Sequence, residues 1–440
     1  MQTWRSRLGC SMLGLLMLAP MVRADDWPQW MGPNRDGGWK ETGILDRFPS
    51  GGPVVKWRTE VGYGYSGPAV AGDTVFVTDY VNAAGKITND FGKRDRLKGK
   101  ERVLAFDRRD GKLLWTHEYP IEYDISYPSG PRATPTIHGG KVYTQGAEGN
   151  LICLDAASGK LLWQHDLKKK YRTEAPMWGF STHPLVDGQK LITLVGGKDS
   201  LVVAFDKDTG AEIWKSLNGK EPGYSSPVIV NAGGTRQLLI FHAEAIASLD
   251  PESGKAHWSV PFKPMYGMSI LTPQVSNDLL FVGGIVSKGI MLKLAKDRPA
   301  AEVLWKGERD TALYPKTSSP LVDNGYLYGV DMDGELRCVN METGERLWET
   351  NEPTTGGKKA NSGTAFLVRN GDRLFLFGEN GVLTIAKLST KGYEPIDSAK
   401  IIEPTNPVFG RMVVWTHPAF AHKCVFVRND RELICVSLEK

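Results

Sequence analysis

The feature that most constrains the fold is a short motif that recurs along the chain. In each of five segments an Asp or Asn is followed four residues later by Gly and eight residues later by Trp. The Asp or Asn side chain can bond to the backbone ahead of it, and Gly supplies the positive φ of a tight, bulged turn. Each motif therefore predicts a β-hairpin with its Trp on the outgoing strand. The five copies are residues 107–115, 155–163, 206–214, 250–258 and 340–348.

The tryptophans of these motifs predict how neighbouring repeats hold together. With two weaker copies included, seven tryptophans follow one another at intervals of 43 to 58 residues. An indole packed between repeats buries much of its roughly 150–250 Å², which at about 25 cal/mol/Å² stabilises by several kcal/mol. We expect structural docking roles for Trp57, Trp115, Trp163, Trp214, Trp258, Trp305 and Trp348.

A second signature fixes the number of repeats. Each begins with a small or polar residue and a proline ahead of an apolar strand, and residues 364–366 stand where one copy lacks the proline. With Gly 49 and Pro 26 among 440 residues, the chain has the turn-forming residues that many short strands need. Eight units of four short strands, with a period in the forties to fifties, predict an all-β, eight-bladed β-propeller with four antiparallel strands per blade. The prolines are Pro68, Pro135, Pro184, Pro227, Pro273, Pro320 and Pro418.

The ends of the repeat region predict how the ring closes. The last unit, residues 416–438, supplies three strands and no Trp, whereas residues 54–58 form a strand with Trp57 and no blade of their own. Joining the two completes the last blade and protects a free strand edge. The predicted domains are a signal peptide (1–24), a Trp-rich N-terminal extension (25–53) and the propeller (54–440).

The first residues indicate export. Arg5 and Arg7 precede an apolar run over residues 8–21, and small residues lead to a cleavage site near Ala24. The run is too short to span a bilayer, so we expect no transmembrane segment and a location in the periplasm or cell envelope. Without Arg5, Arg7 and Arg23, 51 basic residues face 50 acidic ones, which gives no footprint for nucleic acid. We expect a monomer.

Two segments lie outside the repeat pattern. Residues 79–102 interrupt the first blade with a polar stretch whose basic cluster, 93–102, predicts a solvated loop and a partner-docking arm. Residues 26–48 contain Trp27, Trp30 and Trp39, and we expect them to pack along the edge of the propeller, where these side chains would be covered.

The repeated Asp-x-x-Thr/Ser-Gly-Lys-x-x-Trp element resembles the tryptophan-docking motif of the pyrroloquinoline quinone (PQQ) repeat superfamily, over about residues 54–440. The opening 26–37 also resembles that of exported PQQ-like repeat proteins. That superfamily includes quinoprotein alcohol dehydrogenases and the propeller lipoprotein of the outer-membrane β-barrel assembly machinery. The resemblance implies the propeller fold. It implies PQQ and calcium as cofactors only if the residues that bind them in the dehydrogenases are also present. Their vicinal Cys pair, Glu/Asn/Asp calcium site and aspartate base have no equivalent here.

The segments just before the innermost strands predict a ligand site, because they rim one face of a propeller's central channel. They are rich in aromatic side chains with a few polar groups, as a site for a peptide or small molecule requires. His183 and His417 occupy matching positions, which favours a shared structural role. The candidate ligand-binding residues are Tyr65, Arg132, Trp178, His183, Tyr224, Tyr266, Tyr314, Lys316, Asn361, Trp415 and His417.

The sequence favours binding over catalysis. It contains no His-x-x-x-His, no Cys-x-x-Cys, no phosphate-binding loop and no nucleophile elbow, so we predict no metal site and no cofactor, and the sequence identifies no nucleophile or general base. The expected function is a binding scaffold of the periplasm or cell envelope, with an envelope protein, peptide or small ligand as partner. The alternative is a divergent PQQ-dependent oxidoreductase acting on an alcohol or sugar.

Overall fold

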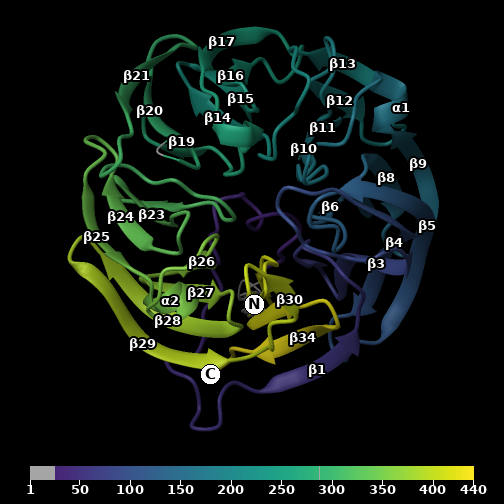
Figure 1. Cartoon of the computed structure of the whole chain (residues 1–440), viewed down its shortest axis with the longest axis vertical. Coiled ribbons are helices and arrows are strands. Elements are labelled where there is room, and N and C mark those ends of the chain that lie inside the picture. The colour runs from purple at the N-terminus through teal and green to yellow at the C-terminus, as the bar shows by residue number, and fades with distance from the viewer. Residues whose placement is uncertain (1–24, 287) are drawn as a thin grey trace, which may run out of the picture.

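The computed structural model describes residues 25–286 and 288–440, and in it eight four-stranded antiparallel sheets form a ring of blades around a central channel (Figure 1). The predicted signal peptide lies outside the described residues. Blade 1 consists of β2 (Ala69–Ala71), β3 (Thr74–Ala84), β4 (Asp95–Asp107) and β5 (Leu113–Ile125). Blade 2 consists of β6 (Thr136–His138), β7 (Lys141–Gln145), β8 (Asn150–Asp155) and β9 (Leu161–Asp166). Blade 3 consists of β10 (Leu185–Asp187), β11 (Lys190–Leu194), β12 (Val202–Asp206) and β13 (Glu212–Ser216).

The same order continues around the ring. Blade 4 consists of β14 (Val228–Ala232), β15 (Thr235–Phe241), β16 (Ala245–Leu249) and β17 (Ala256–Pro261). Blade 5 consists of β18 (Gln274–Ser276), β19 (Leu279–Gly284), β20 (Lys288–Leu294) and β21 (Ala301–Lys306). Blade 6 consists of β22 (Leu321–Asp323), β23 (Tyr326–Val330), β24 (Leu336–Asn340) and β25 (Arg346–Thr350). Blade 7 consists of β26 (Ala365–Asn370), β27 (Arg373–Gly378), β28 (Val382–Ser389) and β29 (Gly392–Lys400).

Blade 8 closes the ring with both ends of the repeat region, as the sequence predicts. It consists of β32 (Ala419–Ala421), β33 (Cys424–Arg428), β34 (Glu432–Ser437) and, as its outer strand, β1 (Val55–Glu60). A separate hairpin, β30 (Asn406–Val408) with β31 (Arg411–Val413), lies between blades 7 and 8 in sequence. Two short helices, α1 (Leu167–Tyr171) and α2 (Glu352–Thr355), and the 3-10 turn Met265–Gly267 complete the described elements. No helix among them is long and apolar enough to cross a membrane.

The proline signature marks the start of each blade. Seven prolines stand immediately before the innermost strand of a blade, and Thr364 does so before β26. Proline is favoured at the first residue or edge of a strand, where its missing N–H costs no ladder hydrogen bond. The eight-bladed count that the sequence predicts is therefore confirmed.

The motif tryptophans dock on the neighbouring blade. Trp115 of blade 1 donates its indole N–H to the carbonyl of Ala156, 3.0 Å away, in the β8–β9 turn of blade 2, and its ring lies over Gly159 of that turn. Five further tryptophans donate in the same way to carbonyls of the next blade: Trp57 to Arg108, Trp163 to Lys207, Trp214 to Pro251, Trp305 to Met341 and Trp348 to Ser389.

Trp258 is the exception. The β20–β21 turn that should receive its indole lacks the Asp-x-x-x-Gly pattern. The Trp258 N–H instead donates to the amide oxygen of Gln237 in its own blade, at 2.8 Å, and the ring packs half-buried beside the core of blades 4 to 6. Trp258 thus packs against a core that includes blade 5, but its indole N–H donates within its own blade.

Residues 79–102 do not form the solvated loop that their polarity predicts. β3 and β4 stay paired as far out as Ala84 and Lys98, and β5 extends alongside them. Many of the polar residues lie on the outer face of this sheet, where Lys98 and Lys100 pair with glutamates of β5. The inner face is buried and includes Glu101, which accepts from the hydroxyls of Tyr119 and Tyr123. On that face Tyr80 stacks on Tyr123 at 4.4 Å between ring centroids. Side chains alternate between the two faces of a strand, so a segment with many polar residues can still bury one face. A count of polar residues does not detect this pattern.

The N-terminal extension does not pack along the propeller edge. Residues 26–44, which we call the strap, run across the base of the central channel (Figure 1, purple). Trp27 exchanges two backbone hydrogen bonds of 2.9 Å with Val70 of blade 1, and the Trp39 N–H donates to the Arg369 carbonyl of blade 7 at 2.7 Å. Trp27 and Trp39 are 1 % and 2 % exposed.

The strap touches every blade. The strap bonds to blades 1 and 7 as described above. Its Pro28 carbonyl accepts from the backbone N–H of Ile137 in blade 2, and its Met31 side chain packs on blade 6. The guanidinium of Arg35 donates to backbone carbonyls of His183, Pro184 and Pro227, at the entries to blades 3 and 4. The remaining contacts are Trp30 Nε1 to Thr272 before blade 5 and Glu41 to the Lys423 N–H of blade 8. The strap is thus a base for the whole ring.

Candidate functional site

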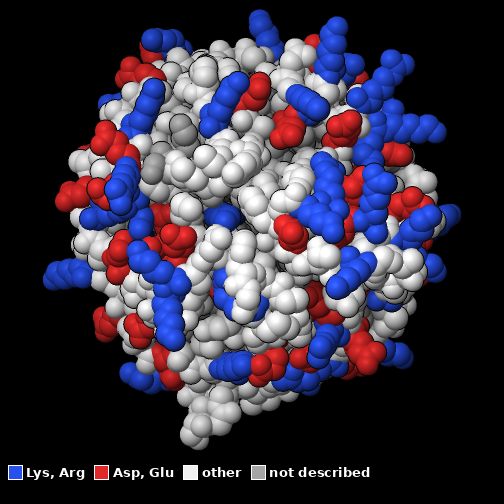
Figure 2. All heavy atoms as spheres, in the orientation of Figure 1, with Lys and Arg blue, Asp and Glu red and all other residues white. Residues whose placement is uncertain are grey.

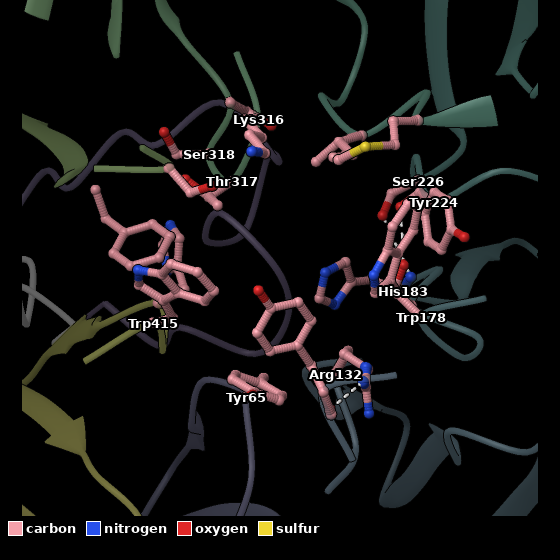
Figure 3. Close-up of a pocket in the computed structure, with 18 of the residues that line it drawn as sticks. Tyr65, Arg132, Trp178, His183, Tyr224, Ser226, Lys316, Thr317, Ser318 and Trp415 are labelled. Atoms are coloured by element: carbon pink, nitrogen blue, oxygen red, sulfur yellow. Dashed lines mark hydrogen bonds between the residues drawn. The ribbon is translucent and has the colours of Figure 1, made fainter. Parts of the chain in front are cut away.

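The channel opens on the face opposite the strap into a pocket of about 210 Å³, which we call the mouth pocket. Figure 2 shows a hollow at the centre of the ring in which uncharged residues predominate. Figure 3 shows the lining side chains converging on it from several blades. Eight of the predicted residues line it together: Tyr65, Arg132, Trp178, His183, Tyr224, Lys316, Trp415 and His417.

The other three predicted residues lie around the pocket without lining it. Tyr266, 60 % exposed, touches the ring of Phe91 at the rim, with 5.8 Å between centroids. Asn361 accepts a hydrogen bond of 2.8 Å from the Lys316 ammonium. Tyr314 is buried, points its hydroxyl to the Glu308 carbonyl, and borders a different hollow.

The floor of the pocket is built by the strap. The indole of Trp30 stacks on the imidazole of His183 with 4.1 Å between centroids and 9° between planes, and lies 4.7 Å from the ring of His417. The Trp30 N–H donates to the Thr272 hydroxyl at 2.9 Å. These contacts close the channel below the pocket, so the site is a blind funnel. Sequence reasoning missed Trp30 because the strap has no repeat to place it.

Both floor histidines are held neutral. His183 Nδ1 accepts from the Thr134 N–H at 2.7 Å, and His417 Nδ1 donates to the Pro418 carbonyl at 2.7 Å. Burial lowers the pKa of His417 to about 4, and burial, with the nearby charge of Arg35, lowers the pKa of His183 well below its usual value. At neutral pH neither carries a proton to donate as an imidazolium, and their contacts are those of structural residues.

This predicts an acid-sensitive floor. The unfolded chain protonates His417 near pH 6.5 and the folded chain only near 4, so about 3 kcal/mol of stability is present above pH 6.5 and lost as the pH falls to 4. His417→Asn retains an N–H donor but cannot titrate. In urea unfolding between pH 7 and 4, we expect the stability gap between wild type and His417→Asn to narrow as pH falls; parallel curves would contradict this assignment.

The walls include aromatic residues that sequence reasoning missed. Phe91 comes from the loop between β3 and β4, Phe409 from the β30–β31 turn, and Tyr127 follows β5. Phe91 is 4.9 Å from Trp178 between ring centroids, and Tyr127 is 6.1 Å from Trp415. The signal for Phe91 was a single phenylalanine within a polar insertion, and sequence alone did not distinguish it from an exposed side chain.

The cations of the pocket face no carboxylate in it. Among the described residues, the lining has Arg132 and Lys316 and no Asp or Glu. The Arg132 guanidinium donates to the carbonyls of Gly130, Ser126 and Tyr127 and lies 5.2 Å from the centroid of the Tyr65 ring. Burial lowers the pKa of Lys316, an effect that Asp333 opposes and Arg411 reinforces. The pocket is therefore electropositive.

These donors do not fit a calcium-bound quinone. Calcium requires six to eight oxygen ligands, commonly including carboxylates. Within the described residues, the lining of the pocket supplies no carboxylate. No group of three or more His, Cys, Asp or Glu side chains within the described part of the chain is arranged to hold a metal ion. The lining hydroxyls and neutral histidines suit hydrogen bonding to a bound molecule.

Comparisons with known proteins agree with the ring of blades. A family model described as outer membrane protein assembly factor BamB matches residues 99–270 and 198–440. The crystal structure of BamB from Moraxella catarrhalis is similar, with 17 % identity, a TM-score of 0.54, and coverage of 86 % of this chain and 97 % of that one. No curated protein gives a significant match to the sequence.

Dehydrogenases with the same architecture are also similar. A europium-containing methanol dehydrogenase has 13 % identity and a TM-score of 0.59, and the match covers 92 % of this chain and 89 % of that one. A quinohemoprotein alcohol dehydrogenase from Comamonas testosteroni has 14 % identity and a TM-score of 0.57, with 94 % and 80 % covered. At such identities the likeness establishes the fold alone.

Proposed function

The chain belongs to the family described as outer membrane protein assembly factor BamB, and from that membership we propose that it is a binding protein of the cell envelope. Its mouth pocket receives a small ligand or a segment of an envelope protein. The observation that supports this proposal most directly is the funnel itself, which is closed below by Trp30 and walled by aromatic side chains. Such a concave, mostly apolar site with a few polar groups is typical of ligand binding.

The alternative, a PQQ-dependent oxidoreductase, receives support from the similar dehydrogenase folds. It would need a calcium site and a base, and the mouth pocket supplies no carboxylate for either. Two outcomes separate the hypotheses. A dehydrogenase would bind PQQ in a saturable, calcium-dependent way and reduce a dye with an alcohol or sugar, whereas a binding protein would do neither.

A crosslinking experiment in cells tests the binding proposal. A photoreactive phenylalanine analogue replaces Tyr266 at the pocket rim, and in a matched control replaces Leu114 on β5, which is 50 % exposed on the outside of blade 1. We expect a discrete crosslinked species from position 266 and none from position 114. Equal crosslinking from both positions, or calcium-dependent dye reduction by the purified chain, would overturn the proposal.

A further inference from the structure

The charge of the mouth pocket is the first guide to its ligand. Lys316 donates to the neutral amide of Asn361, and Arg132 donates only to backbone carbonyls. Within the described chain no ion pair includes either residue. A partly buried cation without a counter-ion is electrostatically costly, and a bound anion relieves that cost. Lys316 lies opposite Tyr65 and Arg132 in Figure 3 and points into the pocket.

The walls are the second guide. Trp178 and Trp415 stand on opposite sides of the pocket (Figure 3). Trp415 is fixed from behind, because its indole N–H donates to the carboxylate of Glu379 at 3.0 Å, and Arg411 holds that carboxylate at 2.7 Å. The polar edge of this indole is thus occupied outside the pocket. Opposed indoles favour a flat, aromatic group between them.

The third guide is a set of hydrogen-bonding groups that lack partners. The hydroxyls of Tyr65, Tyr127 and Tyr224 and the indole N–H of Trp178 are buried and unpaired in the described structure. Burial raises the pKa of Tyr127 to about 12 and those of Tyr65 and Tyr224 further, so all three hydroxyls keep their protons at neutral pH. Buried donors normally find an acceptor, and the Trp178 N–H can only donate. Surrounding protein atoms cover these groups, so a bound molecule reaches them only when a neighbouring side chain moves.

Size is the fourth guide. At about 210 Å³ the pocket is smaller than the roughly 300–1,000 Å³ common for drug-sized ligands. It suits one or two rings.

We propose that the mouth pocket binds a one- or two-ring aromatic carboxylate, with its ring between Trp178 and Trp415 and its carboxylate at Lys316. The inference rests on the proposed binding function and specifies its ligand class. Charge complementarity selects the acid over a neutral analogue of the same shape.

The test compares two probes of the same shape with the full mature chain. Titration with 2-naphthoate is expected to quench tryptophan fluorescence in a saturable way. The neutral analogue 2-naphthamide is expected to bind about tenfold more weakly or worse, because it cannot form a charge-assisted hydrogen bond with the Lys316 ammonium. Isothermal titration calorimetry provides the same affinities without a fluorescence readout.

Variants of Lys316 test whether this side chain causes the preference for the acid over the amide. Lys316→Met is expected to bind the two probes equally, and Lys316→Arg to keep the preference for the acid. Lys359, which pairs with Glu335 away from the pocket, provides the matched control, and Lys359→Met should leave the preference unchanged. Circular dichroism confirms that each variant is folded.

Four outcomes are distinct. Preferential binding of the acid through Lys316 supports the inference. Equal binding of both probes, or binding of neither, overturns it, and so does tight binding of PQQ alone. If crosslinking from position 266 succeeds while naphthoate fails, the binding function stands and the ligand class is wrong; if both fail, both proposals fall.

Discussion

Deleting residues 26–44 is expected to abolish cooperative folding of the propeller or to lower its melting temperature by tens of degrees. The strap bonds to or packs on all eight blades, and its removal uncovers Phe375 and Phe420 at the base of the channel. It also leaves buried carbonyls, now paired with Arg35, without a donor. Each buried polar group without a partner costs about 1–3 kcal/mol.

Single substitutions keep this prediction measurable if the deleted chain fails to fold. Trp27→Ala, at a side chain 1 % exposed, is expected to lower the free energy of unfolding by about 3–5 kcal/mol. Tyr266→Ala, at an aromatic side chain 60 % exposed, is the control and should change it by less than about 0.5 kcal/mol. Urea unfolding monitored by circular dichroism measures both.

A deletion variant that melts at the temperature of the full mature chain would contradict the role of the strap. So would a Trp27→Ala variant no less stable than Tyr266→Ala. Either result would mean that the blades close without a base, held by β1 and the docking tryptophans alone.

The blades could be predicted from sequence because each depends on local signals. An Asp and a Gly at fixed spacing specify the turn, a Trp eight residues on specifies the docking contact, and a proline marks the inner strand. The same signals located the pocket, because the segments before the prolines converge on one face. Trp178 and Trp415 were found in this way without any knowledge of their neighbours.

The rest depends on contacts that no repeat encodes. Trp27 and Trp39 indicated burial, but the position of the strap follows from hydrogen bonds and packing contacts with eight blades that are distant in sequence. Phe91 and Phe409 reach the pocket only because their hairpins lie over the channel mouth. Residues 79–102 also differ from prediction, because two long strands can bury one face while the other stays charged.

Three segments outside the repeats, the strap, the loop before β4 and the β30–β31 hairpin, shape the channel into a pocket. A propeller of eight blades has an open channel, and the strap closes one end of it with Trp30. The loop before β4 and the β30–β31 hairpin narrow the other end with aromatic side chains. Insertions outside the repeats therefore shape both ends of the pocket, whereas Trp178, Lys316 and Trp415 come from the repeated segments before the prolines.

Replacing Gly159 tests the docking of the tryptophans, which is the contact repeated most often around the ring. Gly159 has φ +70°, and a Cβ added to it would lie 2.5 Å from the ring of Trp115. Gly159→Ala is therefore expected to destabilise the fold for two reasons. The left-handed backbone costs about 1–2 kcal/mol for any residue with a Cβ, and the overlap with the indole adds roughly 1–3 kcal/mol.

Gly140, in the same blade, separates the two effects. Its φ is +75°, and a Cβ there would meet nothing within 4 Å. Gly140→Ala is therefore expected to show only the backbone cost, and Gly159→Ala to lose more free energy of unfolding than Gly140→Ala does. In a Trp115→Ala background, where the indole is absent, the difference between the two alanine variants should disappear. Equal losses in the wild-type background would mean that the indole yields freely, and that the turn glycines are required for their backbone conformation alone.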